Sequence, residues 1–369
     1  MIPQADARSI PTDAPLLDAL AVRGVSRRGF VKFCATITSM LALSPELIPQ
    51  VAHALQSARR PSVIWLPFQE CTGCTESITR ADAETIEQLI FEAISLDYQH
   101  TLQAAAGTAA EQARQDAMRA NWGQYLLVVD GSVPLGGAGF CTIAGRSAAD
   151  ILVEAARGAR AIICVGTCAA FGGIPAANPN PTQAVPVSQI VRDKPIVNIS
   201  GCPPIPNVIT AVLVQLLTFG ELPQLDHLGR PKVFYGESIH DRCYRRPFYE
   251  RGQFAESFDD EGARQGWCLY KLGCKGPVTY NACATVKWNG GTSFPIGAGH
   301  GCIGCAEPGF WDRGGFYDAL SVTHTDNLEE IALAAGAGVA VGAAAALLAR
   351  KKQHAAARAG DDGAKGELP

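Results

Sequence analysis

The sequence lacks an excess of basic residues. Its 369 residues include 31 lysines and arginines against 35 aspartates and glutamates, which gives a net charge of −4 at pH 7. Proteins that hold nucleic acid through the phosphate backbone usually present a basic surface. Nothing in the charge balance therefore points to a nucleic-acid partner.

The sequence also lacks the glycine patterns of nucleotide binding. No phosphate loop is present, and no G-x-G-x-x-G follows the first apolar run, Ser62–Leu66. Both patterns place backbone amides around phosphate groups, so their absence argues against a nucleotide site. A nucleotide-type fold without these glycines is better interpreted as a holder of metal clusters.

Residues 61–235 nevertheless have the pattern of a nucleotide-type fold. Short apolar runs alternate with helical segments, which predicts a doubly wound, flavodoxin-like α/β domain with a mostly parallel sheet. The expected strands are Val63–Leu66, Ile94–Leu96, Tyr125–Val129, Ala161–Val165 and Ile196–Ile199. The expected helices are Ala83–Phe91, Thr108–Ala120, Ala148–Ala156 and Pro206–Leu217.

Cysteine is abundant, with thirteen in the chain. Cys71 and Cys74 form a C-x-x-C in the sequence ECTGC after the first apolar run, and Cys168 and Cys202 follow two later runs. The ends of parallel strands converge on one crevice, so these four thiols are candidates for a four-cysteine cluster site. A C-x-x-C alone would serve zinc or a redox dithiol equally well.

Residues 236–320 form a second predicted region, irregular and rich in cysteine. Apolar periodicity fades, and the segment has too few aliphatic residues to bury a core alone. Metal clusters would supply the missing organisation, although structural zinc remains an alternative, since three cysteines and a histidine also suit zinc. The ligand-type residues are His240, Cys243, Cys268, Cys274, Cys283, Cys302 and Cys305.

Residues 1–54 are expected to be a twin-arginine export signal. Ser26–Lys32, read as SRRGFVK, precedes a moderately apolar stretch, and Ala52-His53-Ala54 is a cleavage site of the A-x-A type. The alternative is a basic helix that happens to contain two arginines. Cargo of this route is exported already folded, which favours metal clusters over a disulfide framework for the cysteines.

The C-terminal region is expected to hold a membrane anchor. Residues 331–349 are uncharged and apolar, and Arg350-Lys-Lys352 follow directly. Such a helix would be roughly 28 Å long, about one hydrocarbon core. The basic residues beyond it predict a single pass through the cell membrane, with lipid contact and the body on the periplasmic side. A soluble helix is the alternative; residues 353–369 have the composition of a disordered tail.

Taken together, the motifs resemble one known family over almost the whole chain. They are ECTGC, GTCAAFGG, GCPP, HDRC, CLYKLGCKGP, YNAC and GHGCIGC. The chain resembles the small, electron-transfer subunit of a membrane-bound uptake nickel–iron hydrogenase. Such a protein holds no nickel; it receives electrons from a large subunit that oxidises hydrogen. It passes them to a membrane acceptor, either a b-type cytochrome or a cytochrome–iron–sulfur relay.

The resemblance implies two 4Fe–4S clusters and one 3Fe–4S cluster. The implied proximal 4Fe–4S ligands are Cys71, Cys74, Cys168 and Cys202. The implied distal 4Fe–4S ligands are His240, Cys243, Cys268 and Cys274. The implied medial 3Fe–4S ligands are Cys283, Cys302 and Cys305, with Pro295 about where a fourth cysteine would stand. Of the remaining cysteines, we interpret Cys164 as a buried hydrophobe and leave Cys141 open.

The resemblance also raises three points about individual residues. An equivalent of Glu70 has been linked to proton movement; the alternative is a carboxylate that bonds backbone amides or caps a turn. Gly73 and Gly173 stand where oxygen-tolerant members carry two extra cysteines, so we expect an ordinary proximal cluster and sensitivity to oxygen. The basic Lys232, Arg245 and Arg246 could dock an electron acceptor or form a solvated face.

Two other functional classes compete with the hydrogenase interpretation. One is the cluster-bearing subunit of a quinone-reductase complex, which shares a related proximal-cluster fold. That relative would lack the export signal and the whole second region. The other is an exported zinc scaffold, which would be colourless when purified, whereas a cluster protein would be brown.

Overall fold

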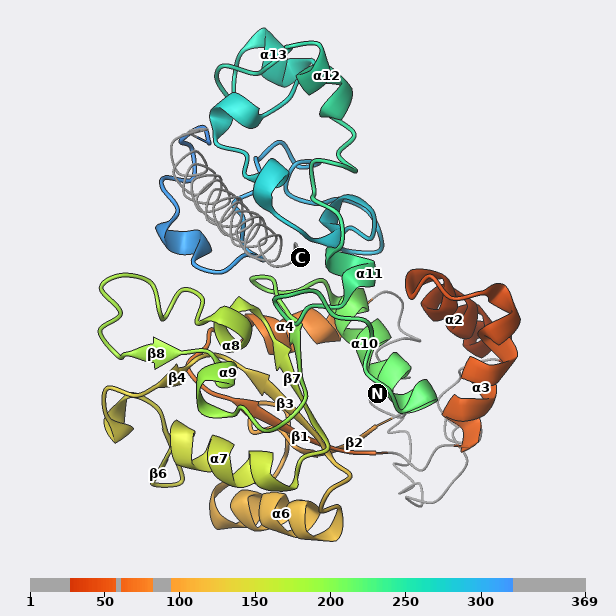
Figure 1. The fold of residues 1–369 in the computed structure, drawn as a ribbon, viewed down its shortest axis with the longest axis vertical. Coiled ribbons are helices and arrows are strands. Elements are labelled where there is room, and N and C mark those ends of the chain that lie inside the picture. The colour runs from red at the N-terminus through yellow and green to blue at the C-terminus, as the bar shows by residue number, and fades with distance from the viewer. Residues whose placement is uncertain (1–26, 58–60, 82–93, 321–369) are drawn as a thin grey trace, which may run out of the picture. The chain divides into compact units, whose positions relative to one another are not determined.

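The computed structural model describes residues 27–57, 61–81 and 94–320 (Figure 1). Contacts divide the chain into two units, Met1–Leu320 and Ser321–Pro369, and the described residues all belong to the first. The expected helix at 83–91, the anchor at 331–349 and the tail at 353–369 lie outside the described residues. Within these three described ranges, no helix is both long and apolar enough to cross a membrane.

The described residues of the first unit contain a five-stranded, wholly parallel sheet. Its strand order, β2-β1-β3-β7-β9, is the 2-1-3-4-5 order of flavodoxin-type doubly wound folds. The prediction of an α/β fold with a parallel sheet is therefore confirmed. The strands are β1 (Ser62–Pro67), β2 (Ser95–Tyr98), β3 (Leu126–Asp130), β7 (Ala161–Val165) and β9 (Ile196–Ile199).

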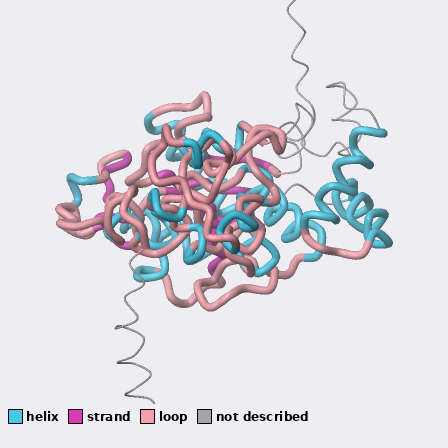
Figure 2. Tube along the Cα trace, turned by 90° about the horizontal axis from the view of Figure 1, so that it is seen from above, coloured by secondary structure: helices cyan, strands magenta, loops and turns pink. Residues whose placement is uncertain are grey.

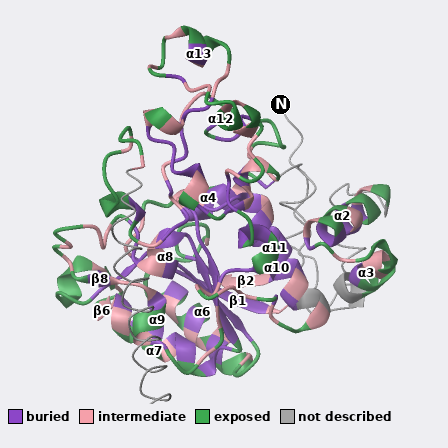
Figure 3. Cartoon of the chain, turned by 45° about the horizontal axis from the view of Figure 1, so that its top comes forward, coloured by how far each residue is buried: buried purple, intermediate pink, exposed green. Residues whose placement is uncertain are grey.

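Helices cover both faces of the sheet, so its central strands are buried, as Figure 3 shows. Alternate residues of β1 face opposite sides: Val63 and Trp65 join one apolar cluster, and Ile64 and Leu66 the other. The first cluster includes α10 (Pro206–Phe219). The second includes α6 (Gly107–Ala120) and α7 (Ala148–Gly158) on the other side of the sheet (Figure 1).

The described part of the expected export signal is helical. It consists of α2 (Arg27–Met40), the 3-10 helix η1 (Pro45–Leu47) and α3 (Ile48–Ser57). Phe30, Phe33 and Ile37 of α2 are buried in the same apolar cluster as α10. The apolar stripe of this segment is thus covered by the folded body.

Short elements connect the strands and carry much of the polypeptide that surrounds their carboxyl ends. Figure 2 shows how much of the chain runs in loops and turns. The short strands are β4 (Val133–Pro134), β5 (Thr142–Ile143), β6 (Arg146–Ser147) and β8 (Ala184–Val185). The short helices are α4 (Gly73–Thr79), η2 (Ala138–Phe140), α8 (Thr167–Phe171), α9 (Val187–Ile190) and α11 (Lys232–Tyr235).

The cysteine-rich region after α11 contains only short helices among its described residues, as the fading periodicity predicts. Its apolar residues, such as Ile239, Leu269 and Phe294, join the cluster that includes α10. The region therefore completes its core on the α/β part of the unit. Its helices are α12 (Arg246–Glu250), α13 (Glu261–Arg264), η3 (Tyr270–Leu272), η4 (Gly276–Val278), η5 (Ala282–Ala284) and η6 (Phe310–Asp312).

Candidate iron–sulfur sites

The first group of candidate ligands gathers at the carboxyl ends of the parallel strands. Cys74 lies on α4 after β1, Cys168 on α8 after β7, and Cys202 directly after β9. Burial raises the pKa of Cys74 well above its usual value, and the charges of Cys168, Cys202 and Cys71 raise it further. The sheet therefore brings these four thiols together, and none of them is in a disulfide.

Glycines leave room beside the sulfur atoms of this group. Gly166 has φ +92°, and a β-carbon there would lie 2.4 Å from Cys74 Sγ. At Gly173, with φ +56°, a β-carbon would lie 2.7 Å from Cys168 Sγ; at Gly73 it would lie 3.2 Å from Cys71 Sγ. The glycines thus let the backbone pass close to the thiols, where a side chain would crowd the sulfur atoms.

The raised pKa values of these thiols are consistent with a site that binds iron. Burial raises the pKa of Cys168 to about 11 and that of Cys202 to about 12. The unligated thiols would therefore stay protonated at neutral pH. Iron displaces such protons and compensates the thiolate charges. The donor set fits a four-cysteine cluster.

A buried carboxyl group beside this site was not expected from the sequence. Asp130, at the end of β3, is fully buried and accepts hydrogen bonds from Trp65 Nε1 at 2.9 Å and Thr75 Oγ1 at 3.2 Å. Burial raises its pKa to about 7, and its charge raises that of Cys74. The only available signal was a charged residue at the end of an otherwise apolar strand.

Glu70 also lies against the first group. Its Oε1 accepts a hydrogen bond from the Thr72 hydroxyl at 3.2 Å, and its Oε2 is buried without a hydrogen-bond partner. Burial raises its pKa. Its charge in turn raises the pKa of Cys141, which is half-buried nearby. Cys164, by contrast, is fully buried on β7, as predicted.

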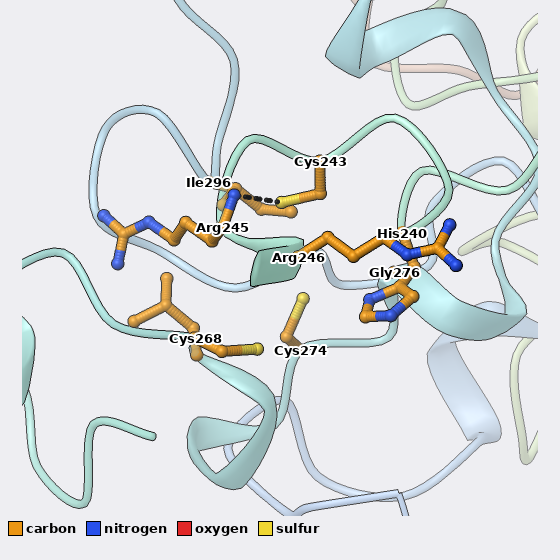
Figure 4. Close-up of a pocket in the computed structure, with 9 residues that line it drawn as sticks. His240, Cys243, Arg245, Arg246, Cys268, Cys274, Gly276 and Ile296 are labelled. Atoms are coloured by element: carbon orange, nitrogen blue, oxygen red, sulfur yellow. Dashed lines mark hydrogen bonds between the residues drawn. The ribbon is translucent and has the colours of Figure 1, made fainter. Parts of the chain in front are cut away.

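The second group lines one small pocket that is partly open to solvent. Figure 4 shows His240, Cys243, Cys268 and Cys274 around this space. Burial and the charge of Arg246 lower the pKa of His240. The ring is therefore kept neutral, which is the form that binds a metal. Leu269 and Ile296 close the pocket with apolar groups.

Arg245 does not belong to a solvated basic face or to an open docking surface. Its side chain is buried and donates hydrogen bonds to the Tyr244 hydroxyl and the Trp267 carbonyl oxygen, both at 2.8 Å. Its backbone N–H points at Cys243 Sγ, 3.4 Å away. Arg245 is thus part of the wall of the second site, which sequence reasoning did not anticipate.

The third group lies between the other two. The charge of Cys305 raises the pKa of both Cys283 and Cys302, so these three thiols are close together. Cys283 and Cys302 are buried. Pro295 is exposed between the buried Phe294 and Ile296; its replacement of a fourth ligand stays a prediction.

The three groups also touch one another. The charge of Cys305 raises the pKa of Cys202, and the hydroxyl of Thr167, the residue before Cys168, donates to the Cys305 carbonyl oxygen. The Cys302 N–H points at Cys274 Sγ, 3.3 Å away. The third group therefore contacts both the first and the second. In the part of the chain that the structure describes, no set of three or more His, Cys, Asp or Glu is arranged to hold a single metal ion.

Two family models match parts of the chain. The family of the C-terminal part of the NiFe/NiFeSe hydrogenase small subunit matches residues 235–317. The family of the NADH ubiquinone oxidoreductase 20 Kd subunit matches residues 71–216.

Whole-chain relatives are hydrogenase small subunits. The uptake hydrogenase small subunit of Azotobacter vinelandii is 50% identical over 93% of this chain and 95% of its own length. That of Afipia carboxidovorans is 51% identical over 95% of both chains.

Solved structures agree with these relatives. A chain of the [NiFeSe]-hydrogenase of Dm. baculatum matches with a TM-score of 0.66 and 33% identity, over 71% of this chain and 100% of its own. The actinobacterial-type NiFe-hydrogenase of Ralstonia eutropha H16 has a chain that matches with a TM-score of 0.64 and 26% identity, over 77% of this chain and 92% of its own. The chain belongs to the family of uptake nickel–iron hydrogenase small subunits.

Proposed function

We propose that this chain carries electrons from hydrogen oxidation in a nickel–iron large subunit to a membrane acceptor. Three iron–sulfur clusters, a proximal 4Fe–4S, a medial 3Fe–4S and a distal 4Fe–4S, would each accept and release one electron when bound. The ligand sets are those given by the motifs: the first group for the proximal site, the third for the medial site and the second for the distal site.

One observation supports this proposal above the others: the three ligand groups form a continuous series. The first group lies beside the third, because the hydroxyl of Thr167, next to Cys168, donates to the Cys305 carbonyl oxygen and the charge of Cys305 raises the pKa of Cys202. The third group contacts the second through Cys302 and Cys274. A chain of redox sites needs such short separations. A scaffold that held separate zinc ions would not need any contact between its sites.

The match to the 20 Kd subunit family favours a second candidate, a quinone-reductase-like protein with one cluster. That match ends at residue 216 and so covers only the first ligand group. The second and third groups fall within 235–317, the range matched by the hydrogenase family. The hydrogenase function therefore accounts for more of the chain's ligand residues.

The proposal includes a cellular location. The twin-arginine sequence would direct the folded protein across the cell membrane, and residues 331–349 would anchor it with the body on the periplasmic side. There a membrane cytochrome, of the b type or with an iron–sulfur relay, would take up the electrons. The Glu70 carboxyl, with one buried oxygen lacking a partner, would face a proton route.

Low-temperature EPR of the air-oxidised, membrane-extracted protein with its co-purified partner tests the proposal. We expect the spin-half signal of an oxidised 3Fe–4S cluster, and a nickel signal from the large subunit. Cys283→Ser should remove the 3Fe–4S signal, whereas Cys164→Ala, a buried thiol outside the three groups, should retain it. A silent spectrum with zinc in the metal analysis would overturn the proposal.

A further inference from the structure

The His240 ring of the second ligand group is not fixed by a hydrogen bond. Histidines that bind metals usually donate their second ring N–H to a carboxylate or a backbone carbonyl, which fixes the orientation of the ring. Among the residues that the structure describes, none forms such a bond with the His240 side chain (Figure 4). The torsion that turns an imidazole has broad preferences, so packing must limit the rotation of this ring.

An aromatic contact with Tyr249 takes the place of the missing hydrogen bond. Tyr249 lies on α12, and its ring packs edge-on against that of His240, with centroids 4.6 Å apart and planes at 77°. Edge-to-face packing is a favoured arrangement of aromatic rings. No other ring pair in the described part of the chain is as close; the next has its centroids 5.1 Å apart. A turn of the imidazole would lose this contact.

Tyr249 is itself held by two rings from the other half of the second site. It contacts Phe254 and Tyr270 edge-on, with centroids 5.7 Å and 5.6 Å apart. Phe254 forms a parallel bridge with Cys268, and Tyr270 begins η3 just after that cysteine. Tyr249 therefore links the ring of His240 to the segment that carries the Cys268 thiol.

We propose that Tyr249 is a positioning residue that holds the His240 imidazole in the orientation needed to bind the distal cluster. The inference rests on the proposed function, which makes His240 a ligand of that cluster. The aromatic ring carries this role, because the Tyr249 hydroxyl bonds no other residue in the described ranges. Tyr249 is 38% exposed, so water can solvate the hydroxyl. A phenylalanine would therefore serve equally well, whereas an aliphatic side chain would leave the imidazole free to turn.

Pulsed EPR of the reduced, purified heterodimer tests this role, because it detects the coupling between an electron spin and a ligating nitrogen. The proposed proximal ligands are all cysteines, so a histidine nitrogen coupled to a 4Fe–4S spin reports on the distal site. An edge-to-face pair favours one orientation by roughly two- to tenfold. We expect Tyr249→Leu to weaken the coupling and broaden its distribution, and Tyr249→Phe to retain the wild-type coupling.

The rate at which a chelator removes iron gives a second readout. Loss of a group that orients a metal ligand typically costs about 10–100-fold in metal affinity or activity. We expect Tyr249→Leu to lose the nitrogen-coupled signal of the distal cluster about tenfold faster than the wild type. The signals of the other two clusters should decay at the wild-type rate.

Tyr317→Leu is the matched control. Tyr317 also packs edge-on against a histidine, His300, with ring centroids 5.6 Å apart and planes at 67°. His300 belongs to none of the three ligand groups, and Tyr317 is 61% exposed. The same exchange at this position should therefore leave the nitrogen coupling and the release of distal iron unchanged.

Three results would overturn the inference. The first is a wild-type coupling and release rate in Tyr249→Leu, and the second is an equal loss in Tyr249→Phe, which would place the role in the hydroxyl. The third is loss of all three cluster signals from both Tyr249→Leu and Tyr249→Met, because Tyr249 would then support the fold of the whole region. A wild-type protein with the 3Fe–4S signal but no histidine coupling would instead refute His240 as a ligand, and this inference with it.

Discussion

Gly166 passes so close to Cys74 that a β-carbon on the glycine would lie 2.4 Å from the cysteine sulfur. Gly166 also has φ +92°, a conformation that strains any other residue. The two constraints act at one point, between β7 and α8. The position of the Cys74 thiol in the first ligand group thus depends on a residue without a side chain.

Gly166→Ala should therefore lose the proximal cluster. The added methyl group must displace Cys74 or the strand end, an overpacking that costs about 1–3 kcal/mol before the backbone strain is added. Iron analysis and EPR of the purified heterodimer would measure the loss. Gly252→Ala is the control: its φ is +68°, but a β-carbon there meets nothing within 4 Å. Full cluster content in Gly166→Ala would contradict the close approach.

Arg230→Ala should destabilise the loop of the third ligand group. The Arg230 side chain is 2% exposed and pairs with Asp226 and Glu307, and it also donates to the Ala306 carbonyl, next to Cys305. Its removal leaves two largely buried carboxylates, which typically costs about 3–5 kcal/mol. We expect a lower thermal unfolding midpoint and early loss of the 3Fe–4S EPR signal on warming.

The control for Arg230 is an exposed ion pair in the same region. Arg264 and Glu261 form a salt bridge with both side chains more than 60% exposed. Such a pair contributes about 0–1 kcal/mol. The thermal unfolding midpoint of Arg264→Ala should therefore equal that of the wild type. Equal unfolding midpoints for Arg230→Ala and Arg264→Ala would show that the buried ion pairs of Arg230 contribute no more to stability than an exposed pair does.

The parallel sheet could be predicted because its strands are short apolar runs between turn residues, a pattern that is local in sequence. Cys164 could be placed on β7 for the same reason. The proximity of Cys202 to Cys305, whose charge raises the Cys202 pKa, could not be predicted, because it joins segments about a hundred residues apart and depends on how two loops pack. Arg245 was misjudged because its charge suggested solvent, whereas hydrogen bonds to Tyr244 and Trp267 satisfy it inside the fold.

In the candidate site, too, the features that are local in sequence could be predicted and those that depend on tertiary packing could not. Motifs identified which cysteines could act together, and the structure brings each set together, while their assignment as cluster ligands stays a prediction. Asp130 was missed because a single carboxylate at a strand end has no motif. Its importance arises from burial and from its hydrogen bonds to Trp65 and Thr75, both of which depend on tertiary packing.

Asp130 should make stability depend on pH. Its pKa is about 7 in the folded chain because of burial, and about 3.9 in an unfolded chain. The folded state binds the proton more tightly, so this contribution to stability is full below pH ~4 and is lost as pH rises to about 7. Asp130→Asn mimics the protonated group and removes the dependence.

The measurement is the difference in thermal unfolding midpoint between wild type and Asp130→Asn from pH 5 to pH 8. We expect the midpoint of the wild type to fall relative to that of the variant as the pH rises. Other titrating groups are common to both proteins and cancel in the difference. A constant difference across this range would mean that the Asp130 carboxyl does not change its charge there.

The hydrogenase should be inactivated by oxygen. The two positions at which oxygen-tolerant relatives carry extra cysteines are Gly73 and Gly173, and both adjoin the first ligand group. A β-carbon would lie 3.2 Å from Cys71 Sγ at Gly73 and 2.7 Å from Cys168 Sγ at Gly173. The sulfurs that could ligate a more oxidised proximal cluster are therefore missing from the places where they would reach it.

Hydrogen uptake by the heterodimer, measured with a redox dye, should stop in air and return after a lag under hydrogen. Uptake that continues in air, with no lag on return to hydrogen, would show that this chain protects its partner by another route.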